Sequence, residues 1–108
     1  MKLGERLTAI ADLVPRGSRV ADIGTDHAYL PVYLITNGIA SQAVAGDVHK
    51  GPYEAARDTI SRSGLSERID LRLGDGIRIL RPGEVDTVVI AGMGGATIID
   101  ILSAEPEI

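Results

Sequence analysis

The chain has 108 residues, a formal net charge of −4 and no cysteine, and its length corresponds to one domain. The absence of cysteine excludes disulfides, thiolate metal ligands and a cysteine nucleophile, and two histidines are too few for most zinc sites. The acidic balance argues against nucleic-acid contacts over most of the surface, and no apolar run is long enough to cross a membrane. We therefore expect a cytoplasmic protein that contacts nucleic acid only near its basic N-terminus.

The first third of the chain alternates between helix and strand patterns. Residues 3–13 place apolar side chains three or four positions apart, which predicts a helix with one buried face. The short apolar run at 18–24 predicts a strand. Residues 28–38 then predict a second helix, with Pro31 in its first turn and Gly38 after its end.

The same alternation continues to the end of the chain. Residues 42–48 predict a second strand, 51–64 a helix and 69–75 a third strand. The β-branched run at 85–92 predicts a strand that is buried on both faces, as parallel strands between helix layers are. Residues 95–105 are expected to form the helix that follows it.

The whole chain, residues 1–108, is therefore predicted to form one α/β domain of Rossmann type, with a parallel sheet that ends after its fourth strand and the following helix. Ligands of such sheets bind beside the carboxyl ends of the strands. Each turn after a predicted strand contains glycine, aspartate or both: 22–27, 47–50, 74–76 and 92–95. Turns use these residues for conformational reasons alone, so one such turn is weak evidence of a site and four together are stronger.

The first of these turns, DIGTDHA at 22–28, differs from the glycine-rich fingerprint of dinucleotide-binding proteins. It contains only Gly24, and Asp26 stands where the fingerprint has its second glycine. A carboxylate at this position would repel a pyrophosphate, which disfavours NAD and FAD. It would favour a ligand with positive charge, and S-adenosylmethionine carries both an ammonium and a sulfonium group.

The other turns offer polar groups that suit the rest of such a ligand. Asp47 lies 23 residues after the glycine of the first turn, near the offset of about 20 at which an acidic residue binds a ribose diol, or it caps the next helix. Asp75 can accept from an adenine amino group or serve as a turn residue. The glycines of 92–95 allow a backbone to approach the ligand, or form a tight turn. His27 and Tyr29 are candidates for the pocket mouth, although a lone histidine beside a turn is more often an ordinary hydrogen-bonding residue.

Four motifs, taken together, resemble one known family. They are VADIGTDHAYLP at 20–31, AGDVHKGPYEAA at 45–56, GDG at 74–76 and IAGMGG at 90–95. In this order they resemble the bacterial tRNA (adenine-N1)-methyltransferase family known as TrmK, which modifies adenine 22. The resemblance implies a Rossmann-like domain that uses S-adenosylmethionine and, in the family, is followed by a helical domain implicated in tRNA binding.

The resemblance also implies roles for individual residues. It places the donor against residues in the turns after the strands: Asp22, Gly24, Asp47, Asp75, Gly76 and Gly92. Asp26 matches the family's proposed catalytic carboxylate, Arg6 matches an N-terminal arginine implicated in function, and His27 and Tyr29 are expected on the substrate side. The later strands of the family's sheet and its helical domain have no counterpart in these residues.

Methyl transfer to adenine N1 needs no strong general base, because N1 of the neutral base carries a free lone pair. The expected contribution of the protein is alignment of the reactants and a carboxylate that holds the exocyclic amino group or stabilises the developing charge. N1 lies on the pairing edge, so the adenine must be unpaired or flipped out. Two alternatives stay open: a domain that binds the donor without turnover, and another nucleotide-binding Rossmann enzyme.

Overall fold

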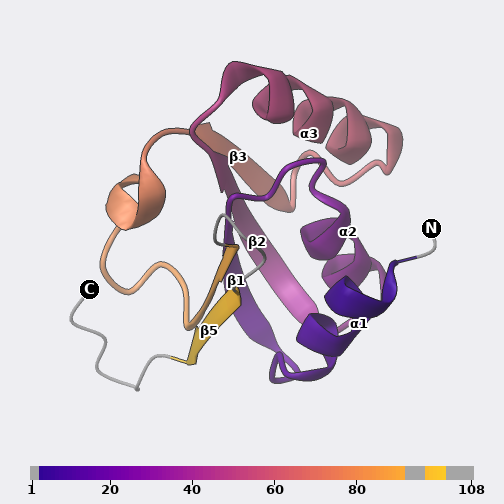
Figure 1. Cartoon of the computed structure of the whole chain (residues 1–108). Helices are drawn as coiled ribbons and strands as arrows, with labels where there is room; N and C mark the ends of the chain where they lie inside the picture. The colour runs from indigo at the N-terminus through magenta and orange to yellow at the C-terminus, as the bar shows by residue number, and fades with distance from the viewer. Residues whose placement is uncertain (1–2, 92–96, 102–108) are drawn as a thin grey trace.

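The computed structural model describes residues 3–91 and 97–101 (Figure 1). This part of the chain forms a five-stranded sheet, three α-helices and one short 3₁₀-helix. In chain order the elements are α1 (Glu5–Asp12), β1 (Ser18–Ile23), α2 (Tyr29–Thr36), β2 (Ala40–Asp47), α3 (Lys50–Arg62), β3 (Ile69–Leu73), η1 (Gly76–Ile79), β4 (Thr87–Ala91) and β5 (Thr97–Ile101). No described helix is long and apolar enough to cross a lipid bilayer.

The sheet has the strand order β3-β2-β1-β4-β5. The pairs β1–β2, β2–β3 and β1–β4 are parallel, which confirms the predicted Rossmann-type arrangement. The chain moves outward from β1 to β2 and β3 and then returns to place β4 on the other side of β1. The order of the strands therefore reverses at β1, the position beside which open α/β sheets bind their ligands.

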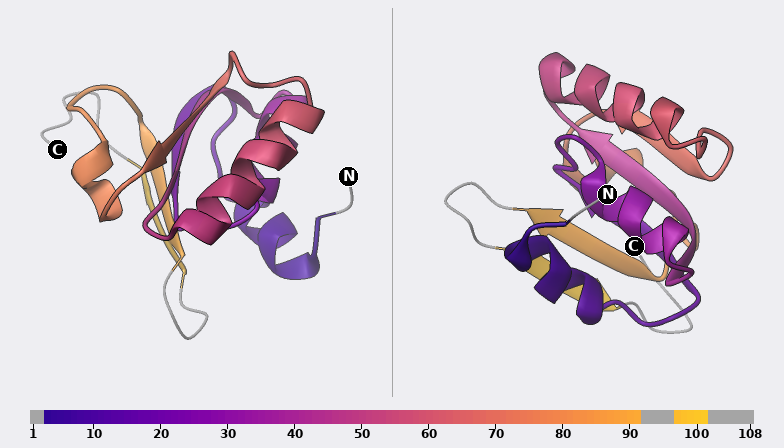
Figure 2. Two further views of the ribbon diagram at one scale, coloured as in Figure 1. Left: turned by 90° about the horizontal axis from the view of Figure 1, so that it is seen from above. Right: turned by 90° about the vertical axis from the view of Figure 1, so that its right-hand side faces the viewer.

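The three α-helices cover one face of the sheet, and η1 with its flanking segment lies over the other (Figure 2). On the helix side, Leu34 of α2 and Ile60 of α3 are buried in one core cluster with Val89 of β4. On the opposite side, Val88 packs in a second cluster with Leu80. Adjacent residues of β4 thus enter different cores, as predicted for a strand that is buried on both faces.

One predicted element is wrong. Residues 95–105 were expected to form a helix, but the described part of this range, Thr97–Ile101, is a strand that pairs antiparallel with β4. Four of its five residues are β-branched, and such side chains lose rotamer freedom in a helix and pack well on a sheet. The free edge of β4 also supplies hydrogen-bond partners along its length. The helix prediction followed from the strand–helix alternation of the preceding segments, whereas the β-branched composition of this segment favours a strand.

The 3₁₀-helix η1 was not predicted, because its four residues are too short to show a periodic pattern. It follows β3 and begins the segment that crosses the second face of the sheet. Leu80 and Val85 of this segment are buried. The segment therefore supplies apolar cover to strands that carry no α-helix on that side among the described residues.

Candidate functional site

The candidate site lies at the carboxyl ends of β1 and β2. These strands are paired in register up to Ile23 and Gly46, so the loop after β1 begins beside the last residues of β2. The amides of Gly24 and Thr25 both donate to the carbonyl oxygen of Gly46, each at 2.9 Å. One carbonyl group at the end of β2 therefore anchors the beginning of the first loop.

The first loop has an unusual backbone. Gly24, Asp26 and Ala28 all have positive φ values, of 77°, 57° and 62°. For a residue with a Cβ atom this left-handed conformation is strained, and such strain persists where the surrounding structure holds it, often at ligand sites. The amide of Asp26 donates to Oδ2 of Asp47 at 3.1 Å, and the amide of Ala28 donates to the carbonyl oxygen of Thr25 at 3.0 Å. These bonds fix the loop in its strained shape.

Asp22 is a buried carboxylate at the base of this loop. Its side chain accepts a hydrogen bond of 2.8 Å from Oγ1 of Thr25, and the residue is 4% exposed. Burial raises the pKa of Asp22 to about 7, with a further increase from the charge of Asp47 and an opposing decrease from the Thr25 hydrogen bond. A cation placed against Asp22 would therefore find a carboxylate that is only partly ionised near neutral pH.

Asp47 connects the first two loops. Its Oδ2 accepts from the amide of Asp26 and its Oδ1 from the amide of His49, both at 3.1 Å. The N-cap of α3 is His49, so the alternative in which Asp47 caps this helix does not hold. A carboxylate has about four acceptor sites, so Asp47 keeps capacity for ribose hydroxyl donors after these two bonds.

Asp26, His27 and Tyr29 form an exposed group at the mouth of the site. Nδ1 of His27 lies 3.2 Å from Oδ1 of Asp26, and the imidazole stacks on the Tyr29 ring with a centroid distance of 5.2 Å. All three side chains are open to solvent. The structure thus brings the predicted catalytic carboxylate together with two residues that were predicted on the substrate side.

The remaining predicted residues lie around this centre. Asp75 is exposed in the turn after β3, and Gly76 follows it with a φ of 57° at the start of η1. Both therefore lie at the same edge of the sheet as the first two loops. Arg6 is exposed on α1, which packs against α2, and Gly92 lies outside the described residues.

Sequence reasoning missed two residues of this site. Thr25 supports Asp22 by its side chain, and Gly46 supplies the carbonyl group that anchors the first loop. A threonine three residues after an aspartate in a turn is a recognisable hydrogen-bonding pattern and could have been noticed. The role of Gly46 depends on the pairing of β1 with β2 and has no local signal.

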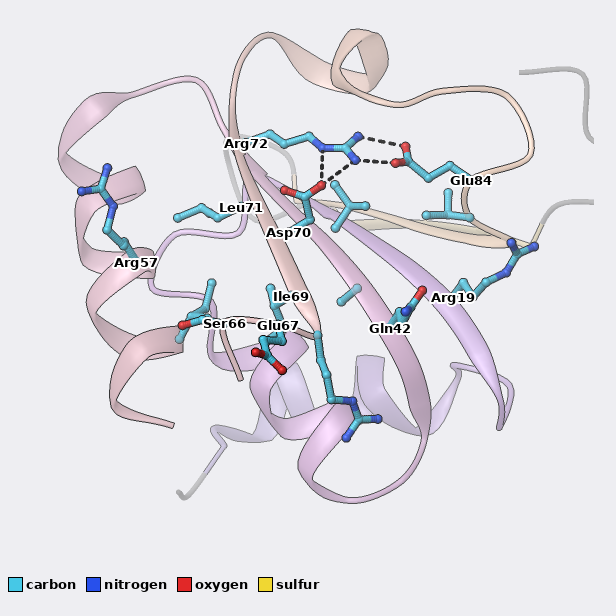
Figure 3. A pocket seen from close by; sticks show the side chains of 15 residues that line it. Arg19, Gln42, Arg57, Ser66, Glu67, Ile69, Asp70, Leu71, Arg72 and Glu84 are labelled. Carbon is cyan, nitrogen blue, oxygen red and sulfur yellow. Dashed lines mark hydrogen bonds and ion pairs between the residues drawn. The ribbon is translucent and has the colours of Figure 1, made fainter. Parts of the chain in front are cut away.

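A separate cleft of about 530 Å³ lies along β3, and Figure 3 shows it from close by. Among its lining residues, Arg72 already binds Asp70 and Glu84. None of the predicted site residues that the structure describes lines this cleft. It is therefore distinct from the site at the carboxyl ends of the strands.

The chemistry of the site fits a ligand that combines positive charge with hydroxyl donors. Asp22, Asp26 and Asp47 gather around one loop, and the hydrogen bonds through Thr25 and the Asp26 amide join them. A pyrophosphate beside this loop would meet the carboxyl groups of Asp22 and Asp47, whereas an ammonium or sulfonium group would be attracted by their ionised forms. The donor set therefore agrees with S-adenosylmethionine and disfavours a dinucleotide.

Comparison with known proteins decides the family. A family model described as "Methyltransferase domain" matches residues 3–108. The chain belongs to this methyltransferase-domain family. It is 47% identical over 104 residues to the tRNA (adenine(22)-N(1))-methyltransferase of Bacillus subtilis, in an alignment that covers 96% of this chain and 44% of that protein.

Solved structures of methyltransferases have the same fold. The crystal structure of the B. subtilis m1A22 tRNA methyltransferase TrmK matches with a TM-score of 0.83 and 46% identity over 86% of this chain and 40% of that one. M. capricolum TrmK in complex with S-adenosyl-homocysteine matches with a TM-score of 0.78 and 36% identity over 85% and 42%. The resemblance indicated by the four motifs is confirmed, and the chain spans less than half the length of these methyltransferases.

Proposed function

We propose that this methyltransferase-family chain binds S-adenosylmethionine and transfers its methyl group to N1 of adenine 22 in tRNA. The observation that carries the proposal is that the side chains of Asp22 and Asp47 both hold the loop after β1, Asp22 through Thr25 and Asp47 through the amide of Asp26. Support comes from the similarity to methyltransferases whose names state this reaction. Residues 1–108 would act as the donor-binding domain of the enzyme, in the cytoplasm.

The donor side of the site would use the buried carboxylates. Asp22 and the Gly24 turn would hold the methionine part, with the ionised form of Asp22 attracting its ammonium group. Asp47 would accept from the ribose hydroxyls, and Asp75 with Gly76 would contact the adenine. S-adenosylmethionine, when bound, supplies an electrophilic methyl group.

The exposed group at the mouth would face the target base. Asp26 would hold the exocyclic amino group of the adenine or stabilise the positive charge that the base gains, since a carboxylate fixed near a developing cation lowers the barrier. His27 contacts Asp26 and stacks on Tyr29, and both rings would line the entry of the base. Arg6 and the other basic residues near the N-terminus would contact the tRNA.

The proposal is tested by two measurements on the same chain. Isothermal titration calorimetry with S-adenosylhomocysteine should show saturable binding, and incubation with tRNA and methyl-labelled donor should give 1-methyladenine at position 22. Binding without labelled product would refute turnover by this chain and favour the alternative of a donor-binding domain. The chain covers 44% of the B. subtilis enzyme, so the methylation assay tests turnover by these residues alone.

A dinucleotide control addresses the other alternative. NADH fluorescence should stay unchanged when the chain is added, because the carboxyl groups of Asp22 and Asp47 would lie beside the pyrophosphate and disfavour its charge. Saturable NADH binding in the absence of S-adenosylhomocysteine binding would refute the proposed function. A variant with Asp75 replaced by asparagine, which leaves the buried carboxylates intact, should still bind S-adenosylhomocysteine more tightly than NADH.

A further inference from the structure

Ile79, the last residue of η1, packs against two glycines at the carboxyl ends of neighbouring strands. A Cβ atom built on Gly46 would overlap Cδ1 of Ile79, and one built on Gly74 would overlap Cγ2 of the same side chain. Ile79 therefore occupies the space that two missing side chains leave open. A larger residue at either glycine would force the Ile79 side chain to shift.

Through Gly46, this contact is linked to the candidate donor site. The carbonyl oxygen of Gly46 accepts both amides that begin the first loop, those of Gly24 and Thr25. The next residue is Asp47, which fixes the amide of Asp26. A shift of Gly46 would thus move the anchor of the strained loop and one of its carboxylates together.

Arg72 of β3 holds Ile79 in this position by a hydrogen bond to its carbonyl oxygen. Its Nη1 donates to the carbonyl oxygen of Ile79 at 2.6 Å and to Oε2 of Glu84 at 2.8 Å, and its Nη2 contacts Oε1 of Glu84. Glu84 also accepts from the amide of Arg81 at 3.0 Å. The Arg72 guanidinium therefore ties both ends of the segment that carries Ile79 to β3.

The Arg72–Glu84 pair stays ionised at neutral and mildly acidic pH. The hydrogen bonds from Arg72 lower the pKa of Glu84 to about 2 and raise the pKa of Arg72. Both side chains are about one fifth exposed, at 20% and 22%, and a bidentate pair of this kind fixes geometry as well as charge. The position of Ile79 should not change between neutral and mildly acidic pH.

We propose that Ile79 is a positioning residue for the donor site, acting through Gly46 and held in place by Arg72 and Glu84. The inference rests on the proposed function, because it assumes that the loop after β1 binds the donor. A residue that only fills the core would change stability without changing the affinity for the donor. Substitution of Ile79 should lower the affinity for the donor by more than the loss of stability alone accounts for.

The decisive comparison is between Ile79→Val and Leu80→Val. The first change removes Cδ1, which faces Gly46, and keeps Cγ2, which faces Gly74. Leu80 is buried in the same segment, while the nearest atoms to both glycines belong mainly to Ile79. The affinity for S-adenosylhomocysteine, measured by calorimetry well below each melting temperature, should fall about fourfold in Ile79→Val, the scale of one buried methyl group. Leu80→Val should leave it within a factor of about two.

Equal losses of affinity in the two variants, or a change in melting temperature alone, would overturn the inference. Arg72→Lys, which keeps the charge and loses the bidentate geometry, should weaken binding in the same direction as Ile79→Val. If the Arg72→Lys variant does not fold, the Glu84→Gln variant is measured in its place, with the same expected direction.

Failure of the proposed function is recognised separately. If the unmodified chain does not bind S-adenosylhomocysteine, the proposed donor site is wrong, and the positioning role is then measured by amide hydrogen exchange. The Gly24 and Thr25 amides should exchange faster in Ile79→Val than in Leu80→Val, because Gly46 accepts both of them. Equal exchange rates in the two variants would refute the role of Ile79 without reference to any ligand.

Discussion

The raised pKa of Asp22 predicts that donor binding depends steeply on pH below neutrality. Burial raises this pKa to about 7, and the proposed partner of Asp22 is the ammonium group of the donor. Only the ionised carboxylate attracts an ammonium group. Lowering the pH should therefore weaken binding in a range where an ordinary aspartate would remain fully charged.

The size of the effect follows from the fraction of ionised Asp22. With a pKa of about 7, this fraction is about 3% at pH 5.5 and about 50% at pH 7. Since apparent affinity scales with the competent fraction, the affinity should rise about fifteenfold over this interval. The rise should level off near pH 8, where α-amino groups themselves lose their proton.

Calorimetry with S-adenosylhomocysteine between pH 5.5 and pH 8 measures this profile. Asp22→Asn should bind weakly and show a flat profile, whereas Asp58→Asn, which changes an exposed carboxylate of α3 outside the proposed donor site, should keep the profile of the unmodified chain. Binding below pH 7 should also release a proton, visible as a dependence of the heat on the buffer. A constant affinity between pH 5.5 and pH 7 would refute the pairing of a buried, partly protonated Asp22 with the donor ammonium.

The raised pKa of Asp22 also determines the direction in which the free energy of unfolding changes with pH. The folded chain holds a proton on Asp22 up to about pH 7, whereas the unfolded chain, in which this carboxyl has its ordinary pKa of 3.8, loses it at lower pH. The folded state therefore binds more protons between about pH 4 and pH 7, and the contribution of Asp22 to the free energy of unfolding decreases through this window and is constant above it. Asp22→Asn should remove this decrease in urea unfolding at successive pH values.

Four further substitutions test other parts of the structure. Asp26→Asn should lower turnover in the tRNA methylation assay about 10²-fold with donor affinity retained, and unchanged turnover would contradict its assigned role. Thr25→Val removes the bond that lowers the pKa of Asp22, so the midpoint of the binding profile should move to higher pH. Gly46→Ala forces a methyl group onto Ile79 and should cost about 1–3 kcal/mol in urea unfolding; a neutral result would mean that η1 is not packed there. Leu34→Ala empties a fully buried site and should cost about 2–5 kcal/mol, which a melting temperature within error of the parent would disprove.

The sequence predicted the elements whose patterns are long and local. The apolar spacing of residues 3–13 matches α1, where Ile10 and Ala11 are buried, and the β-branched run at 85–92 contains β4. The convergence of Asp22 and Asp47 also followed from sequence, because the carboxyl ends of parallel neighbours must meet at one edge. Their roles toward a donor stay predictions until binding is measured.

The parts that sequence could not predict depend on contacts between distant segments. The conformation of Asp26 is left-handed because its amide bonds to Asp47, twenty-one residues away, and nothing within DIGTDHA specifies that bond. In a sequence pattern Ile79 is an ordinary apolar residue. In the structure, its position against Gly46 and Gly74 leaves no room for a side chain at either glycine. A glycine at a strand end is usually interpreted as a turn residue, but at position 46 the requirement is space for Ile79. A glycine that serves only a flexible turn can be replaced by another turn residue. Substitution of Gly46 should instead disturb the candidate site, because it removes the space that Ile79 occupies.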